Sequence, residues 1–276
     1  MYTEATLENE PFLIFKSDSG VSKTIAKNSF YGFGEIKIYD DILNDGETFL
    51  DIGMNIGAIS FQLKKRNPSL KIFGFEPVKE FYDLAVKNLS RFDQVICLNI
   101  GLGNQHSTIG LPKFPIDEIS NFGSAELRDA GDGYRVKVQR LDDVPELSGV
   151  LPKLVKIDVE GQEDLVLQGM EKLIHDNIYL SIEADRPQTV KKYIEFLQSQ
   201  KLDMYFGRLA VTNRNAEKRS AGYDLRSTTH IFACYKPPSP WMKKLLTKIM
   251  NYDDYYMCIE PTLLRTRERL RMPIHR

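Results

Sequence analysis

Short apolar runs alternate with segments of helical spacing between residues 48 and 199. The apolar runs predict strands at 48–52, 71–75, 95–98, 154–159 and 178–182. Apolar residues three and four positions apart predict helices between them, at 56–66, 78–89, 163–174 and 189–199. Strands that alternate with helices in this way predict βαβ units, and continuous aliphatic strands suit a parallel sheet covered on both faces.

Two later strands, 203–209 and 230–235, are joined by a polar stretch rather than a helix, which predicts a terminal antiparallel pair. The segment from Gly103 to Tyr134 breaks the alternation, and a loop of that length inside a compact domain is usually functional. We therefore predict an α/β fold in three parts: an N-terminal cap segment at 1–47, the main domain at 48–236, and a basic amphipathic helical tail at 237–276.

Composition narrows the class of protein only slightly. Hydrophobic residues make up 42% and charged residues 27% of the 276 residues, and the formal net charge is −1. The chain as a whole therefore has no basic footprint for nucleic acid. The three cysteines form no C-x-x-C pair, which favours a reduced cytoplasmic protein. The first residues do not resemble a signal peptide, and no apolar run reaches the roughly 18–20 residues that cross a bilayer.

The first βα turn carries the strongest chemical signal. A strand ends at Asp51, Gly53 and Gly57 follow, and a helix begins. A ligand can therefore lie against the backbone and the unpaired N–H groups of the helix N-terminus. Glu76 ends the next strand, where dinucleotide folds place the carboxylate that binds a ribose diol. Asn55 stands where a dinucleotide site needs its second glycine, and its side chain would crowd a pyrophosphate.

Three interpretations of this turn compete. Asn55 disfavours a nicotinamide dinucleotide, and a plain strand–turn–helix junction with packing glycines does not account for Glu76. S-adenosylmethionine has a ribose and an amino-acid end but no phosphate, so it fits best. Asp51 could then serve its ammonium, directly or through water.

The strand at 154–159 adds a second signal. It places Asp158 and Glu160 at its carboxyl end, where open α/β sheets bind ligands. A helix cap with a first-turn acid explains the nearby Glu163 and Asp164. It explains Asp158 and Glu160 less well, because they precede a glycine rather than the helix.

Three motifs, in order and spacing, resemble the FkbM-type methyltransferase family. They are Phe49-Leu50-Asp51-Ile52-Gly53-x-Asn55-Ile56-Gly57, Gly74-Phe75-Glu76-Pro77, and Lys156-Ile157-Asp158-Val159-Glu160-Gly161-x-Glu163 with Leu167-x-Gly169 behind it. Leu141-Asp142-Asp143 also resembles the family's segment ahead of the fourth strand. The resemblance covers residues 48 to 185. One departure is Met54, where such turns usually carry a small alanine and where a larger side chain would crowd the methionine end of the cofactor.

The resemblance implies a class I, Rossmann-like methyltransferase fold: a seven-stranded, mostly parallel sheet with helices on both faces and a terminal antiparallel hairpin. It also implies S-adenosyl-L-methionine as cofactor and O-methylation of a sugar or natural-product hydroxyl. Glu76 would bind the ribose hydroxyls, and residues 99–101 would face the adenine. The cofactor-binding residues implied in this way are Asp51, Gly53, Asn55, Gly57, Glu76, Pro77, Asn99, Ile100, Gly101 and Asp158.

Methyl transfer to a hydroxyl needs an aligned acceptor and a general base. We expect Asp158 or Glu160 to accept the proton, because both would border the sulfonium and the acceptor. His106, in the long segment, is the best histidine candidate. His175, near the end of a predicted helix, is interpreted as a cap and His230 as structural.

Glu183 and Asp185 follow the fifth strand and could reach the same crevice. With Asp158 they could hold Mg²⁺, which prefers oxygen ligands. The spacing is not diagnostic, and we predict no metal. In the long segment, three aromatic residues either stack on a sugar ring or cover the sheet edge, and residues 121–124 could close on the cofactor. The three aromatic residues are Phe114, Phe122 and Tyr134.

The tail places six apolar side chains on one face of a predicted helix at 241–250, namely Trp241, Met242, Leu245, Leu246, Ile249 and Met250. Residues 241–276 hold eight Lys/Arg against four Asp/Glu, a local charge of +4. Such a helix either lies on an anionic membrane surface or packs on its own domain or a partner subunit.

Together these patterns predict a cytoplasmic O-methyltransferase whose partner is a small-molecule or glycan acceptor and not a nucleic acid. Peripheral contact with the inner face of the membrane, through the 241–250 helix, and a homodimer are left open. Two alternatives remain for the function: methylation of a non-sugar natural product, and a non-catalytic nucleotide-binding module of the same fold.

Overall fold

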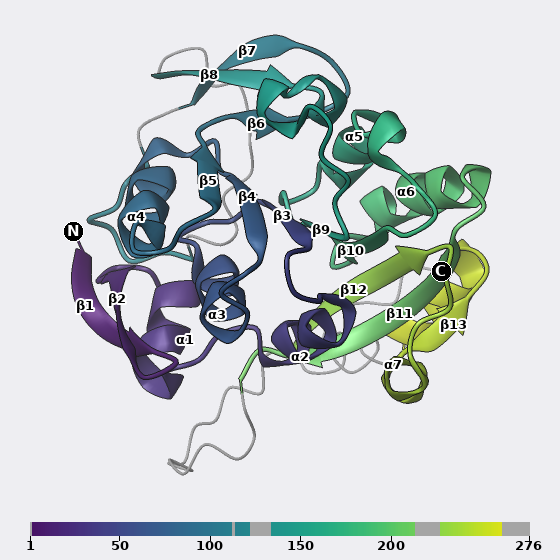
Figure 1. The fold of residues 1–276 in the computed structure, drawn as a ribbon, viewed down its shortest axis with the longest axis horizontal. Helices are drawn as coiled ribbons and strands as arrows, with labels where there is room; N and C mark the ends of the chain where they lie inside the picture. Colours follow the sequence, from purple (N-terminus) through teal and green to yellow (C-terminus); the bar gives the residue numbers. More distant parts are fainter. Residues whose placement is uncertain (1, 112–113, 122–133, 213–226, 261–276) are drawn as a thin grey trace, which may run out of the picture.

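The computed structural model describes residues 2–111, 114–121, 134–212 and 227–260. A central sheet of eight strands crosses the molecule (Figure 1). In spatial order its strands are β13 (Thr247–Ile249), β11 (Asp203–Ala210), β12 (Ser227–Cys234), β10 (Tyr179–Glu183), β9 (Leu154–Ile157), β3 (Thr48–Ile52), β4 (Lys71–Phe75) and β5 (Val95–Leu98). Neighbouring strands from β10 to β5 are parallel, whereas β12 is antiparallel to both β10 and β11.

Helices cover both faces of this sheet, because its central strands bury side chains on both sides. One face packs on α5 (Glu163–Gln168) and α6 (Pro187–Ser199). The other face packs on α2 (Phe33–Ile42) and α3 (Ala58–Arg66). A further apolar cluster joins α1 (Val21–Asn28) and α4 (Lys79–Leu89) to the hairpin of β1 (Tyr2–Leu7) and β2 (Glu10–Phe15).

The predicted class I methyltransferase fold, with a mostly parallel sheet and a terminal antiparallel pair, is confirmed. The sheet has eight strands rather than the seven expected, because β13 is added at its edge. Several elements begin or end one to three residues away from the prediction, and two differences are larger or bear on the site. β9 ends at Ile157, so Asp158 and Glu160 lie in the loop beyond the strand. The helix predicted at 163–174 ends at Gln168, because the chain turns at Gly169, and a separate 3₁₀ turn follows at Glu171–Leu173.

Part of the long segment after β5 forms strands, which the sequence did not predict. β6 (Gly101–Leu102), β8 (Tyr134–Gln139) and β7 (Ser107–Leu111) form a separate three-stranded sheet. It lies beside the central sheet at the top of Figure 1. Two 3₁₀ turns, Leu141–Asp143 and Pro145–Leu147, lead from it to β9.

The continuous helix predicted at 241–250 is wrong. α7 (Pro240–Leu245) lasts six residues, Thr247–Ile249 then joins the edge of the sheet as β13, and residues 252–260 are helical. The six apolar side chains therefore separate: Met242, Leu246 and Ile249 are buried, and Trp241, Leu245 and Met250 are exposed. The predicted membrane contact now rests on the three exposed side chains alone. Among the described residues, no helix combines the length and apolar character needed to span a bilayer.

The predicted cap segment at 1–47 packs on the main sheet. The backbone N–H of Phe33, at the start of α2, donates to the carbonyl of Val211 at 3.2 Å. A Cβ atom on Gly34 would lie 2.8 Å from the Cβ of Leu209. This close contact with the end of β11 brings Tyr31 and Glu35 to the carboxyl edge of the sheet.

Candidate active site

A cavity of about 390 Å³ lies at the carboxyl ends of β3, β4, β9 and β10. This is the edge where open α/β sheets bind ligands, and small-molecule sites usually measure about 300–1,000 Å³. Residues of all three sequence motifs line it, together with Tyr31, Glu35 and Thr228 from outside those motifs.

The 52–57 turn forms one wall of the cavity in a backbone conformation that its residues permit. Gly53 and Gly57 have φ of +77° and +81°, and Asn55 has φ of +51°, which asparagine tolerates better than most residues. The Asn55 Oδ1 atom accepts the N–H of Ile56 at 2.8 Å, so this side chain folds back on its own turn. Gly53, Asn55 and the neighbouring backbone line the cavity as the sequence predicts. Gly57 does not: it packs under Leu89.

Glu76 holds the turn from the neighbouring strand. Its Oε2 accepts the N–H of Asn55 and its Oε1 the N–H of Val78, both at 2.9 Å. Burial raises the pKa of Glu76 to about 7, although the two backbone donors oppose that rise. Each carboxylate oxygen keeps a further lone pair. Glu76 can therefore accept hydrogen bonds from a ligand while it fixes the wall of the cavity.

The end of β5 contributes less directly than the sequence suggests. Pro77, Ile100 and Gly101 line the cavity, whereas Asn99 does not. The Asn99 Nδ2 atom donates to the carbonyls of Glu76 and Pro77, at 2.8 and 3.0 Å. The predicted contact of Asn99 with adenine is therefore corrected: its amide positions the turn that carries Glu76.

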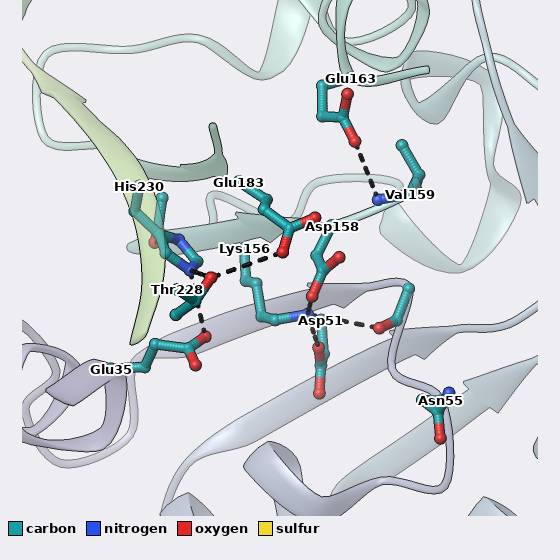
Figure 2. Close-up of polar contacts among 12 residues, drawn as sticks. Glu35, Asp51, Asn55, Lys156, Asp158, Val159, Glu163, Glu183, Thr228 and His230 are labelled. Carbon is teal, nitrogen blue, oxygen red and sulfur yellow. Dashed lines mark hydrogen bonds and ion pairs between the residues drawn. The ribbon is translucent and has the colours of Figure 1, made fainter. Parts of the chain in front are cut away.

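Asp51 is also displaced from its predicted role. Its side chain is fully buried beneath the cavity and does not line it. Oδ2 accepts a hydrogen bond from Ser60 Oγ at 2.6 Å, and Oδ1 lies 3.6 Å from the ammonium of Lys156 (Figure 2). Asp51 therefore positions Lys156 rather than facing a ligand directly.

The Met54 side chain does not extend wholly into the cavity, where the sequence predicts that it would crowd the cofactor. That side chain is buried against Gly74 of β4, and a Cβ atom on Gly74 would lie 2.3 Å from Met54 Sδ. Glycine at 74 thus leaves the room that methionine at 54 needs. Met54 still lines the cavity in part, but the predicted crowding is relieved by this pairing.

Lys156 is the central residue that sequence reasoning missed. Its ammonium lies 3.1 Å from Asp158 Oδ2 and donates to the carbonyl of Gly53 at 3.3 Å (Figure 2). Burial alone would lower the pKa of Lys156, but the surrounding carboxylates, Asp158 first, hold it well above its ordinary value. A lysine inside an otherwise apolar strand was the available signal, because a buried cation requires carboxylate partners.

Asp158 and Glu183 form a pair of unequal carboxyl groups. Burial would raise the pKa of Asp158, but Lys156 and a hydrogen bond with Glu183 hold it below its ordinary value. Burial and the charge of Asp158 raise the pKa of Glu183 well above its ordinary value. Of the two groups, Asp158 therefore ionises first, and a proton shared by the pair resides preferentially on Glu183. Thr228 Oγ1 donates to Glu183 Oε1 at 3.4 Å from the opposite strand.

Glu160 lies beside this pair in an unusual backbone conformation, with φ of +57°. Its carboxylate binds Arg186, which also lies 3.0 Å from Asp185. Burial and the charge of Asp158 raise the pKa of Glu160 to about 7, although Arg186 opposes the rise. Glu163 orders the loop, since its Oε1 accepts the N–H groups of Val159 and Gly161 at 3.3 and 3.0 Å. Its place in the first turn of α5, with Asp164, confirms the helix-terminus interpretation.

The structure places His106 away from the cavity, where the sequence predicted a catalytic role. The side chain is 57% exposed, lies outside the cavity, and its Nε2 is 2.9 Å from Asp143 Oδ2. The segment that carries it forms the separate three-stranded sheet, which holds His106 away from the carboxyl edge. His175 contacts the Pro152 carbonyl through Nε2 at 2.9 Å instead of capping a helix.

His230 is buried beside the cavity and has a structural place. Its Nδ1 lies 3.1 Å from Ser181 Oγ and its Nε2 3.3 Å from Thr228 Oγ1. Burial lowers the pKa of His230 to about 4, although the charge of Asp158 opposes the fall. The imidazole is therefore neutral at pH 7 and offsets none of the negative charge around it.

Glu35 reaches the cavity from α2 and was also missed. It is 5% exposed, and its Oε1 lies 3.4 Å from the Tyr39 hydroxyl and 3.7 Å from His230 Nε2 (Figure 2). Burial raises the pKa of Glu35 to about 7, opposed by Lys156. No sequence pattern links residue 35 to this edge, because its position depends on how α2 packs on β11.

The two described aromatic residues of the long segment, Phe114 and Tyr134, pack on α4 and do not line the cavity. Phe114 packs edge-on against Phe81 at 4.8 Å, and the Tyr134 hydroxyl accepts the N–H of Lys79 at 2.9 Å. Phe122 and residues 123–124 lie outside the described residues. Asn121 does line the cavity, pressed so closely on Gly20 that a Cβ there would lie 2.1 Å from its Oδ1.

Three carboxyl groups lie close enough to share a cation. Ligand oxygens of Asp158, Glu160 and Glu183 all lie within 4.8 Å of one another. Asp185, which the sequence offered as a third ligand, is turned toward Arg186 instead. Lys156 and Arg186 already neutralise two of the three carboxyl groups, so the cluster is an internal salt-bridge network.

Comparison with known proteins assigns this arrangement to a class. The chain matches the methyltransferase FkbM domain over residues 51–223 and belongs to that family. Methyltransferase sdnD of Sordaria araneosa is 28% identical over 222 residues, which covers 63% of this chain and 85% of that protein. Hexuronic acid methyltransferase AglP of Haloferax volcanii is 27% identical over 170 residues, which covers 60% of this chain and 68% of that protein.

Among solved structures, a precorrin-6y C5,15-methyltransferase of Geobacter metallireducens superposes with a TM-score of 0.47 at 17% identity. The superposition covers 73% of this chain and 87% of that one.

Proposed function

We propose that the chain is an S-adenosylmethionine-dependent O-methyltransferase that acts on a hydroxyl of a sugar, glycan or sugar conjugate. One observation carries this proposal: Gly53, Glu76 and Asp158, one from each motif, line a single cavity at the carboxyl edge of the sheet. Membership of the FkbM family supports methyl transfer. The relative named for hexuronic acid supports a sugar acceptor.

The lining residues fit this cofactor better than a dinucleotide. Glu76 has a lone pair on each oxygen for a ribose hydroxyl. The two lining cations, Lys156 and Arg186, are already bound by carboxylates, so they are poorly placed to hold a pyrophosphate. The excess of carboxyl groups also favours a cationic sulfonium.

In this proposal Asp158 is the general base. S-adenosylmethionine, which the 52–57 turn and Glu76 would hold, would supply the methyl group for the acceptor oxygen. The hydroxyl proton passes to Asp158, whose side chain is 29% exposed and lines the cavity. Lys156 keeps this carboxylate ionised. Because Asp158 and Glu183 titrate as a coupled pair, the uptake of the hydroxyl proton belongs to both carboxyl groups together. Positioning of the acceptor would supply much of the remaining rate enhancement.

Transfer of a labelled methyl group from S-adenosylmethionine to a panel of nucleotide sugars and oligosaccharides tests the proposal. Asp158→Asn should lower turnover about 10²-fold or more and weaken binding of S-adenosylhomocysteine much less. His106→Ala, outside the cavity, is the control and should keep its turnover. Full turnover in Asp158→Asn would remove the proposed base. Methyl transfer to non-sugar hydroxyls alone would show that the acceptor is a natural product rather than a sugar.

A further inference from the structure

The end of the cavity away from the 52–57 turn is built by segments outside the family-matched residues 51–223. Tyr31 and Glu35 reach it from the N-terminal segment, and Ser227, Thr228 and Thr229 from the start of β12. Glu183, at the end of β10, and Asp185 just beyond it meet these segments there. We call this region, with its lining residues Tyr31, Glu35, Glu183 and Thr228, the acceptor end.

The acceptor end has more acid than base. Of the described residues, six carboxyl side chains and two cations line the whole cavity. Lys156 is bound by Asp158 and Asp51, and Arg186 by Glu160 and Asp185. Neither cation is left to balance Glu35, and His230 beside it is neutral at pH 7. Glu183 lies 4.0 Å from Arg186 and is the member of its pair that holds the proton. Among the described residues, the carboxyl group of Glu35 therefore faces the acceptor end with no lysine or arginine bound to it.

Most hydroxyl donors near the acceptor end are already used within the protein. Thr228 Oγ1 donates to Glu183, and the Tyr39 hydroxyl is oriented toward Glu35 and Ser181. A molecule that enters meets the carboxyl oxygens and the Tyr31 hydroxyl, so it gains most when it supplies donors of its own. Hydroxyl groups do so, and an ammonium group does so with added charge. A carboxylate supplies none. Above about pH 7, where Glu35 is ionised, a carboxylate would also place like charges together in a poorly solvated site.

We infer that, if the protein is the proposed sugar methyltransferase, its acceptor end selects a neutral or amino sugar and rejects a sugar that carries a carboxylate. Glu35, outside the family-matched residues, is the residue that sets this selectivity. The inference rests on the proposed function and extends it from the type of reaction to the charge of the acceptor.

The test measures binding of methyl glucoside, methyl glucosaminide and methyl glucuronide to the full chain loaded with S-adenosylhomocysteine, by ligand-observed NMR. These probes differ in charge but share the sugar ring. The glucoside and the glucosaminide should each bind at least about tenfold more tightly than the glucuronide, a difference of about 1.4 kcal/mol in binding free energy. Glu35→Gln should narrow that ratio several-fold. Glu195→Gln, an exposed carboxylate on α6, is the matched control and should leave the ratio unchanged.

The outcomes separate the inference from the proposed function. Tightest binding of the glucuronide, or an unchanged ratio in Glu35→Gln, would overturn the selectivity. Retained S-adenosylhomocysteine binding with no response to any of the three sugars would overturn the sugar-binding role of the acceptor end. Loss of S-adenosylhomocysteine binding by the unaltered chain would instead contradict the proposed function. In Glu35→Gln, the same binding measurement verifies that the variant is folded.

Discussion

Gly53 packs directly on the backbone of Asp158. A Cβ atom on Gly53 would lie 1.8 Å from the carbonyl oxygen of Asp158, so no other residue fits here without movement of the loop. Two motifs separated by a hundred residues are therefore one structural unit. The turn that would hold the cofactor therefore also fixes the position of the proposed base, Asp158.

This contact gives a prediction with a built-in control. Gly46→Ala places alanine at φ of +74° with no atom within 4 Å, so it should cost only the backbone term of about 1–2 kcal/mol. Gly53→Ala has nearly the same φ, +77°, but adds the clash, which should cost about 1–3 kcal/mol more. Chemical denaturation of both variants measures the difference. Equal losses would mean that the Gly53–Asp158 contact is looser than described.

The pairing of Met54 with Gly74 predicts non-additive effects. Gly74→Ala should push the Met54 side chain toward the cavity and lower the free energy of unfolding by about 1–3 kcal/mol. The Met54→Ala/Gly74→Ala double variant should lose less stability than the sum of the two single variants, since the smaller side chain leaves room for the new methyl group. A double-mutant cycle, read by denaturation and by S-adenosylhomocysteine binding, measures the coupling. Strict additivity would show that the two side chains do not compete for space.

Glu35 should make the ligand-free protein less stable as pH rises. Burial raises its pKa from 4.5 to about 7, so the folded state retains a proton that the unfolded chain releases. The contribution of Glu35 to the free energy of unfolding is therefore greatest below pH 4.5 and is lost as the pH rises through about 7. Glu76 and Glu160, with pKa values also near 7, act in the same direction.

Glu35→Gln should therefore raise the free energy of unfolding at pH 8 by roughly 2–3 kcal/mol and reduce its fall between pH 5 and 8. Thermal unfolding across this range, with Glu195→Gln as the exposed control, measures the effect. A variant with the same pH dependence as the unaltered chain would show that Glu35 is ionised in the folded state.

The tail offers a comparison between adjacent residues. A continuous helix would place Ile249 and Met250 on one face, whereas β13 points them to opposite sides. Ile249 is 1% and Met250 60% exposed. Ile249→Ala should thus lower the free energy of unfolding by about 2–4 kcal/mol, and Met250→Ala should change it by less than about 0.5 kcal/mol. Similar losses in both would favour the helix instead.

Much of the fold and one wall of the cavity could be predicted from the sequence. Parallel strands share a carboxyl edge, so residues that end successive strands, such as Gly53, Glu76 and Asp158, must lie near one another. The apolar spacing that defined each strand and helix is local, and the motifs follow one another in order. The buried lysine at 156 was visible in the same way but was not used.

The rest depends on packing between distant segments. Glu35 reaches the cavity because α2 packs against the end of β11, a contact that no periodicity records. His106 lies away from the cavity because its segment forms a second sheet. The apolar pattern of the tail is compatible with either a helix or a strand. The open edge of β11, which β13 joins, decides for the strand, and this edge is a tertiary feature. Asp51 and Asn99 belong to the correct motifs, but their partners turn them away from the cavity.

Calorimetric titration of the full chain with S-adenosylhomocysteine and with NAD distinguishes a methyltransferase site from a dinucleotide site. We expect saturable 1:1 binding of S-adenosylhomocysteine and no binding of NAD. Glu76→Gln should weaken the binding about tenfold, as one charge-assisted hydrogen bond to a ribose hydroxyl is lost. Binding of NAD without S-adenosylhomocysteine would contradict the account, and so would undiminished affinity in Glu76→Gln.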